Sequence, residues 1–379
     1  MKRTLLVCAI AGLSSTAIPA PVRASTLFGV ANLVTDDQMA HPAQITDPNL
    51  ANAWGISSSP ASPFWVSNNA NGLSTLYRVN PATNATSIGP LVVTLPSPDG
   101  GSTAATPTGQ AFNSVGGFNG DAFLFASEDG TISGWRGALG TTAEVLQTAS
   151  SDNVYKGLTL GASGGNPYLY AANFRMGEID VLKGSPGAPN LLGNFTDPNL
   201  PAGYAPFNIA NLGGSLYVSY AVQDAAKHDE VPGAGNGIVD VFDLQGVLIR
   251  RLATGGLLDA PWGMAIAPSS FGDLAGELLV GNFGDGTINA FDLSTQNPKA
   301  PEALKDSQGQ PIAIEGLWGL IPGNGANAGS LDDIYFSAGP DDETHGLFGV
   351  IAAVPEPGSG ALAALGLLSL ALTRRPRPA

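Results

Sequence analysis

Two acidic loops hold the side chains of this sequence that are best suited to chemistry. The first, residues 223–237, reads QDAAKHDEVPGAGNG, and the second, residues 339–346, reads GPDDETHG. Carboxylates beside an imidazole can ligate a cation or act as acid and base. The candidate ligand-binding or metal-binding residues are therefore Asp224, His228, Asp229, Glu230, Asp341, Asp342, Glu343 and His345.

The spacing within these loops matches no fixed metal motif, such as HExxH or a calcium-loop pattern. A solvated polar loop is therefore the alternative interpretation. If a metal ion binds, Ca²⁺ is favoured over zinc because oxygen ligands dominate. No catalytic residue can be assigned from the sequence.

The elements that must position these loops come from a repeat of about fifty residues. Each unit has a short apolar strand, a turn, a second strand such as LLVGN, another turn and a third strand such as TINAFDL. Successive units begin 48 to 56 residues apart. Their first pairs are Trp54-Gly55, Thr108-Gly109, Lys156-Gly157, Phe207-Asn208, Trp262-Gly263 and Trp318-Gly319.

Six units of this length predict an all-β, six-bladed β-propeller with four-stranded blades. The sixth unit ends after its third strand, and the stretch TLFGVANLV at residues 26–34 is a spare strand before the first unit. We expect this N-terminal strand to complete the last blade and close the ring, which removes exposed sheet edges. The two acidic loops, both between a second and a third strand, then lie at the same mouth of the central channel.

Other polar or aromatic features have simpler interpretations. Residues 127–130 and 282–286 contain Asp-Gly and are predicted to be hairpin turns. The three Trp-Gly pairs offer either a ligand platform or packing between blades, and their shared repeat position favours packing. His41 is expected in an exposed connection.

The blade pattern resembles six-bladed propellers of the NHL and regucalcin/gluconolactonase kind over nearly the whole body. The blade pattern, combined with the C-terminal tail and with sequence segments such as SAGPDDETHGLFG, resembles a family of uncharacterised bacterial secreted propellers. The resemblance implies the architecture and leaves the function open.

The N-terminus is typical of a secretory signal peptide. A basic start is followed by a mostly apolar run to Ile18, and small residues precede a predicted cleavage between Ala24 and Ser25. The single cysteine, Cys8, would leave with this peptide, so the exported body would have no disulfide bond. We assign residues 1–24 to the signal peptide and residues 25–353 to the propeller.

The C-terminal segment, residues 354–379, combines Pro355-Glu356-Pro357, an uncharged run at 358–372 and a basic end. The arginines of that end include Arg374 and Arg375. This order resembles the PEP-CTERM sorting signal that exosortases of Gram-negative bacteria read. It implies a transient inner-membrane anchor, cleavage near the triplet, and release to the extracellular matrix or attachment at the cell surface. An ordinary single-pass anchor is the alternative.

The body between the two ends is strongly acidic. It has ten basic and thirty acidic residues, which gives a net charge of −20. Nucleic acid is an unsuitable partner, because phosphate neutralisation requires a basic surface. Solubility and attraction of cations are favoured instead.

Two classes of function remain open at this stage. One is a binding or scaffold protein of the surface or matrix that presents its loops to a polysaccharide, a surface protein or a cation. The other is a Ca²⁺-type propeller hydrolase or lactonase with its site at the channel mouth. The sequence shows no phosphate loop, no dinucleotide fingerprint and no nucleophile elbow in its strand–turn–helix setting.

We expect deletion of residues 355–379 to leave a folded ring, because the last predicted strand ends before the triplet. Circular dichroism and thermal melting of the shortened protein would test this. Loss of cooperative unfolding would show that the tail is part of the fold.

Overall fold

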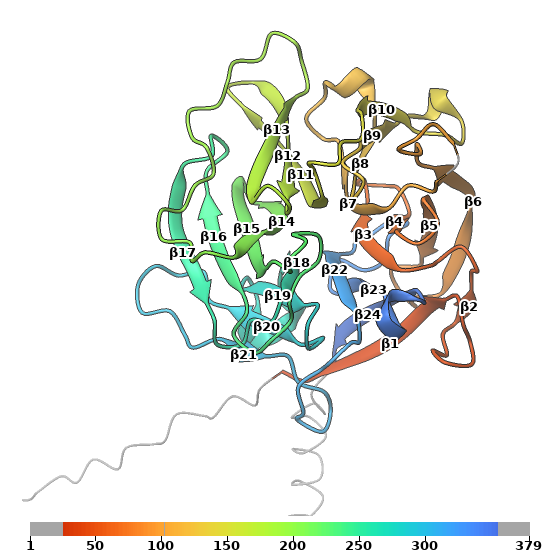
Figure 1. Ribbon diagram of the computed structural model, residues 1–379. Coiled ribbons are helices and arrows are strands. Elements are labelled where there is room, and N and C mark those ends of the chain that lie inside the picture. Colours follow the sequence, from red (N-terminus) through yellow and green to blue (C-terminus); the bar gives the residue numbers. More distant parts are fainter. Residues whose placement is uncertain (1–25, 102, 355–379) are drawn as a thin grey trace, which may run out of the picture.

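The computed structural model describes residues 26–101 and 103–354, which form a six-bladed β-propeller. Figure 1 looks along the central axis, with the first strand of each blade nearest that axis. The fold class predicted from the sequence is therefore confirmed. The predicted cleavage point at Ala24 and Ser25 and the sorting residues lie outside the described residues. Those sorting residues are Pro355, Glu356, Pro357, Arg374 and Arg375.

The first three blades follow one another along the chain, each from its inner to its outer strand. Their strands are β3 (Ala53–Ser57), β4 (Phe64–Asn68), β5 (Leu73–Val79) and β6 (Thr86–Thr94); β7 (Pro107–Phe112), β8 (Phe123–Ser127), β9 (Ile132–Trp135) and β10 (Glu144–Gln147); and β11 (Tyr155–Ser163), β12 (Asn166–Asn173) and β13 (Glu178–Lys183).

The last three blades continue the same pattern. Their strands are β14 (Tyr204–Leu212), β15 (Ser215–Val222), β16 (Ile238–Phe242) and β17 (Leu248–Thr254); β18 (Pro261–Ile266), β19 (Leu278–Asn282), β20 (Ile288–Phe291) and β21 (Glu302–Ala303); and β22 (Leu317–Pro322), β23 (Ile334–Ala338) and β24 (Leu347–Ala353), with β1 (Phe28–Thr35) and β2 (Ile45–Thr46) outside them. A single turn, α1 (Pro340–Glu343), joins β23 to β24, and short 3₁₀ turns lie at Phe118–Gly120, Gly137–Leu139 and Ser269–Leu274.

The third blade departs locally from the four-stranded pattern, because no strand follows β13 in its sheet. Pro186 and Pro189 interrupt the next segment, and proline has no N–H to donate to a strand ladder. The segment instead crosses to the fourth blade, where the backbone N–H of Gly193 donates to Gln245 at 2.8 Å. It thereby connects two neighbouring blades.

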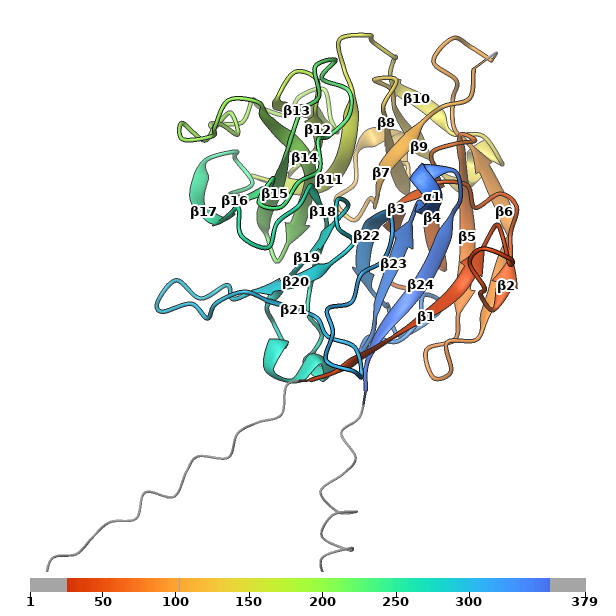
Figure 2. The same cartoon turned by 60° about the horizontal axis from the view of Figure 1, so that its bottom comes forward.

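The N-terminal strand closes the ring, as the sequence predicts. Strand β1 pairs antiparallel with β24, from Phe28 opposite Ala353 to Thr35 opposite Leu347. The two ends of the described chain therefore leave the ring side by side, at the bottom of Figure 2. The α1 turn lies at the other end of β24, which is the upper end of that strand in Figure 2.

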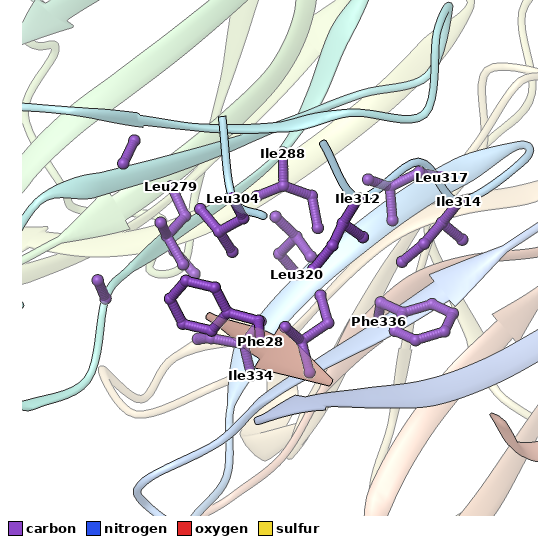
Figure 3. Packing of buried hydrophobic residues seen from close by; sticks show 14 of the residues in the cluster. Phe28, Leu279, Ile288, Leu304, Ile312, Ile314, Leu317, Leu320, Ile334 and Phe336 are labelled. Carbon is purple, nitrogen blue, oxygen red and sulfur yellow. The ribbon is translucent and has the colours of Figure 1, made fainter. Parts of the chain in front are cut away.

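The closing strand is anchored in an apolar core between the fifth and sixth blades (Figure 3). Phe28 is 1% exposed, and its ring centroid lies 4.7 Å from that of Phe271. Leu279 and Ile288 of the fifth blade and Ile334 of the sixth belong to the same cluster. Burial of this aromatic side chain thus joins the first strand to two blades at once.

Glycine in five of the six inner strands lets neighbouring strands approach one another at the narrowest part of the channel. A Cβ on Gly109 would overlap the backbone of β11, and one on Gly263 would overlap the carbonyl oxygen of Trp318. The repeated x-Gly pair is therefore a packing requirement of the ring. The glycines at this level are Gly55, Gly109, Gly157, Gly263 and Gly319. The fourth blade has Asn208 instead, whose Nδ2 donates to the carbonyl of Trp262 at 2.7 Å.

We expect the Phe28→Ala variant to lose about 3–5 kcal/mol of unfolding free energy, the usual cost of removing a buried aromatic ring. Deleting residues 26–34 should destabilise the ring further, because it exposes the edge of β24. Val30→Ala is the matched control, since Val30 is on the same strand and 42% exposed. Thermal unfolding that is unchanged in the deletion would show that β1 does not hold the ring closed.

Candidate functional site

An aromatic layer closes the channel at the start of the inner strands. Trp54 and Trp318 stack with their ring centroids 3.6 Å apart, and Trp262 meets Trp318 at 5.8 Å and 82°. Phe283 stacks on the other side of Trp318, and Phe174 and Phe207 join the same cluster. The three tryptophans are 0–5% exposed, so they are packing residues rather than an open platform.

The closed channel has two ends of different character. On one side, the later parts of the inner strands line a cavity of about 280 Å³ that has no charged residue in its wall. On the other side, the loops after the second strands form the channel mouth. The six residues directly after the second strands are Asn69, Glu128, Phe174, Gln223, Phe283 and Gly339.

Lys156 lies at the base of this mouth, at the repeat position that Trp54 occupies in the first blade. Its side chain is 1% exposed, and its ammonium nitrogen lies 2.5 Å from Glu128 Oε1 and 3.2 Å from Asp229 Oδ1. The same nitrogen is 5.1 Å from the centroid of Trp54, a cation–π contact. Burial alone would lower the pKa of Lys156, but the charges of Glu128, Glu230 and Asp229 outweigh it and raise that pKa. The ammonium therefore stays charged.

A chain of side-chain amides holds Glu128 in place. Trp54 Nε1 donates to Asn52 Oδ1 at 2.9 Å, and Asn52 Nδ2 donates to Asn69 Oδ1 at 3.4 Å. Asn69 Nδ2 then donates to Glu128 Oε2 at 2.9 Å. Both carboxylate oxygens of Glu128 are thus engaged, one by Asn69 and the other by Lys156.

The sixth-blade loop reaches the mouth through a left-handed turn. Asp341, Asp342 and Glu343 have φ angles of 54°, 52° and 64°. For residues other than glycine this conformation costs roughly 1–2 kcal/mol each. Contacts around the turn compensate: His41 Nε2 lies 2.8 Å from Asp341 Oδ2, and the hydroxyl of Thr344 donates to the Asp341 carbonyl at 2.7 Å.

This turn directs Glu343 toward the centre of the mouth. Its Oε1 is buried and has no hydrogen-bond partner in the part of the chain that the structure describes. Burial raises the pKa of Glu343 to about 7, and the charges of Glu128 and Glu230 add to that shift, while Lys156 and a hydrogen bond with Asn52 oppose it. Glu230 of the fourth-blade loop also has a raised pKa, again chiefly because of burial. The carboxyl groups of the two loops are therefore close enough to influence each other at the mouth.

The structure divides the residues proposed from the sequence into two sets. Asp229, Glu230 and Glu343 surround Lys156, and His228 contacts Asp229 with its Nδ1 2.7 Å from Oδ1.

The remaining four residues take other roles. Asp224 accepts hydrogen bonds from the backbone N–H groups of His228 and Asp229 and so shapes the loop. Asp341 pairs with His41, Asp342 is exposed, and His345 Nδ1 lies 3.0 Å from Asp36 Oδ2, which raises the pKa of His345.

Sequence reasoning missed Glu128 and Lys156. Glu128 was hidden within a predicted hairpin turn. The position of Lys156 in the repeat did indicate its role. Four of the six repeat starts are aromatic, which indicates a buried position, and the body has only ten basic residues. A lysine buried there has to be neutralised by carboxylates from nearby loops. Which carboxylates reach it depends on loop conformation and could not be inferred.

Glu128, His228 and Asp229 could in principle share a metal ion. One ligand atom from each lies within 4.8 Å of the others. The Lys156 ammonium, however, is already in contact with Glu128 and Asp229. A cation at this point would have to compete with it.

The C-terminal tail and the propeller body of this chain are similar to different sets of known proteins. The tail matches the model of the PEP-CTERM protein-sorting motif over residues 353–375. This motif implies processing by an exosortase and indicates an exported protein. No helix among residues 26–101 and 103–354 is long and apolar enough to cross a membrane, and the anchor expected at 358–372 lies outside that part.

The body is similar to two uncharacterised proteins of Acanthamoeba polyphaga mimivirus. R648 is 32% identical over 352 residues, which cover 87% of this chain and 82% of the relative. L690 is 32% identical over 349 residues, which cover 87% of both chains. The chain belongs to the family of these mimivirus proteins. These family members are viral, so the bacterial family and the NHL kinship expected from the sequence stay predictions.

Solved structures show the likeness of fold alone. A mutant of the α-L-arabinofuranosidase Arb93A from Fusarium graminearum, in complex with an iminosugar inhibitor, superposes with a TM-score of 0.53 and 11% identity over 86% of this chain and 97% of that one. Streptogramin B lyase has a TM-score of 0.45 and 14% identity, with the same coverage of both chains.

The raised pKa of Glu343 gives a stability test. A carboxyl group whose pKa is higher in the folded state favours folding below its unfolded value, near 4.5, and loses that contribution as the pH rises through about 7. Glu343→Gln stays neutral throughout. We therefore expect it to gain about 1–3 kcal/mol of unfolding free energy relative to the wild type between pH 5 and pH 8.

Denaturant unfolding at the two pH values would measure this difference. Asp342→Asn is the control, because Asp342 lies in the same turn and is exposed. The Asp342→Asn variant should follow the pH dependence of the wild type. An equal pH dependence for Glu343→Gln would show that Glu343 is not buried as a neutral acid.

Proposed function

We propose that this family member is an exported, exosortase-processed propeller that binds a polyhydroxyl ligand, of the carbohydrate class, at its channel mouth. Display at the cell surface or in the extracellular matrix of a Gram-negative bacterium is part of this proposal. The sorting motif at residues 353–375 supports export. Polysaccharide is a ligand that such a location offers in abundance.

One observation carries the choice of ligand class. Trp318 is fully buried, and its Nε1 donor has no hydrogen-bond partner among residues 26–101 and 103–354; nor does the buried Oε1 acceptor of Glu343. Gly339 adjoins both residues: a Cβ there would be 3.4 Å from Trp318 Nε1 and would overlap the side-chain oxygen of Asn52, and the Gly339 carbonyl accepts a hydrogen bond from the backbone N–H of Glu343 at 3.2 Å. A hydroxyl group can accept from an indole N–H or donate to a carboxylate, so the hydroxyl groups of a polyhydroxyl ligand suit both.

The negative charge of the channel mouth further restricts the class of ligand that can bind. Glu128, Asp229, Glu230 and Glu343 surround the single ammonium of Lys156. A ligand with carboxylate, sulfate or phosphate groups would be repelled, whereas a neutral or amino sugar would not.

Hydrolysis is the second candidate, and the raised pKa of Glu343 favours it. An acid with a pKa of about 7 can donate a proton to a leaving group near neutral pH. Glu230, on the facing loop, is the second carboxyl group available, because Glu128 is already hydrogen-bonded through both oxygens. The substrate would again be a glycoside or a lactone.

We expect the purified protein to bind neutral or amino oligosaccharides, and not acidic ones, on a glycan array. Trp318→Phe and Glu343→Gln should each weaken binding about 5- to 10-fold, because the first removes a hydrogen-bond donor and the second replaces a carboxylate acceptor with a weaker neutral amide. Asp342→Asn is again the control and should bind as the wild type does. Calorimetry with the best oligosaccharide would measure the affinities.

A reducing-end assay on the same oligosaccharide would separate binding from hydrolysis. Turnover that Glu343→Gln abolishes would favour the hydrolase. Binding that neither Trp318→Phe nor Glu343→Gln alters would contradict the proposed site.

A further inference from the structure

The Lys156 ammonium occupies the position that a metal ion would take among the surrounding ligands. Glu128 and Asp229 approach it from two different blades, at 2.5 Å and 3.2 Å, and His228 Nδ1 lies 2.7 Å from the same oxygen of Asp229. The ligand atoms of these three residues lie within 4.8 Å of one another. A cation with bonds of about 2.3–2.6 Å to oxygen requires ligand atoms at such separations.

The surroundings of the ammonium are those of a bound ion rather than of a surface salt bridge. The Lys156 side chain is 1% exposed and that of Glu128 is 12% exposed, whereas that of Asp229, on the solvent side of the ammonium, is 63% exposed. Trp54 and Phe174 present their ring faces at 5.1 Å and 6.0 Å from the nitrogen. Glu230 adds a further negative charge to the same region. Ion, ligands and an apolar wall are therefore all supplied by the chain itself.

We propose that Lys156 is a tethered cation that fills a latent divalent-cation site at the channel mouth, so that the wild-type protein assembles this acidic site without a metal ion. A covalently attached ammonium does not dissociate, whereas a free ion must be captured from solution. A divalent ion would also meet the repulsion of the ammonium itself. This inference does not rest on the ligand proposed above, and it replaces the calcium expectation that the sequence suggests.

The test compares metal binding by the wild type and by the Lys156→Met variant, with Ca²⁺ and Tb³⁺ as the probes. Methionine keeps an unbranched side chain of similar length and removes the charge. A Tb³⁺ ion at the vacated position would lie close enough to Trp54 for energy transfer from the indole. We expect the wild type to show no thermal shift between millimolar Ca²⁺ and chelator, and no Tb³⁺ luminescence above that of Glu128→Gln.

The Lys156→Met variant should behave in the opposite way. Its melting temperature should fall in chelator and recover with Ca²⁺, and its Tb³⁺ luminescence should rise at least tenfold over the wild type. The double variant Lys156→Met/Glu128→Gln should lose that luminescence. If Lys156→Met folds only when refolded with Ca²⁺, that dependence is equally the expected result.

Two outcomes would overturn the proposal. The first is stoichiometric Ca²⁺ or Tb³⁺ binding by the wild type that Glu128→Gln abolishes, which would make the mouth an ordinary metal site. The second is a folded Lys156→Met or Lys156→Gln variant that gains no metal binding. If Lys156→Met does not fold with or without Ca²⁺, Lys156→Gln, which can donate hydrogen bonds to Glu128, gives the same comparison.

Discussion

Six strands that converge on one axis leave a hole whose width depends on the side chains at its narrowest level. In this protein five of those strands have glycine there, and the remaining one, in the fourth blade, has Asn208, whose amide donates a hydrogen bond to the neighbouring strand. The hole is therefore too narrow to remain open, and the large side chains one residue earlier meet above it. The aromatic layer, the separation of the two ends of the channel and the burial of Lys156 all follow from this narrow waist.

Burial of Lys156 in turn organises the loops around it. A buried ammonium without partners is very costly, and removing one partner of a buried pair typically costs about 3–5 kcal/mol. Glu128, Asp229 and Glu230 come from two blades, so the loops that bear them must be ordered for the charge to be balanced. Low polarity at the base of the mouth strengthens these interactions and also raises the pKa of Glu343. The same environment thus creates both a fixed charge pair and a titratable acid.

The sequence predicts the architecture well, because the repeat and the spare N-terminal strand are one-dimensional signals. The ring closure between β1 and β24 and the position of the loops between second and third strands could both be inferred in this way. The site was harder to infer. Asp229, Glu230 and Glu343 do lie at one mouth, but Asp224, Asp341 and His345 serve to shape or hold their own loops.

The reason for this difference is conformational. Glu343 reaches the mouth only because three successive residues adopt positive φ angles, which no spacing rule foretells for Asp, Asp and Glu. Pro186 and Pro189 do explain, after the fact, why the third blade has three strands. Local rules therefore account for where strands stop, whereas side-chain convergence depends on strained turns and long-range charge balance.

Strand β24 runs through the ring from one face to the other. It begins beside the α1 turn at the channel mouth and ends at Ala353, next to the start of β1 (Figure 2). A chain that continues beyond Val354 leaves from the face opposite the mouth. An attachment made through that end would therefore leave the channel mouth, with Lys156 and its acidic loops, facing away from the point of attachment and open to ligands in solution.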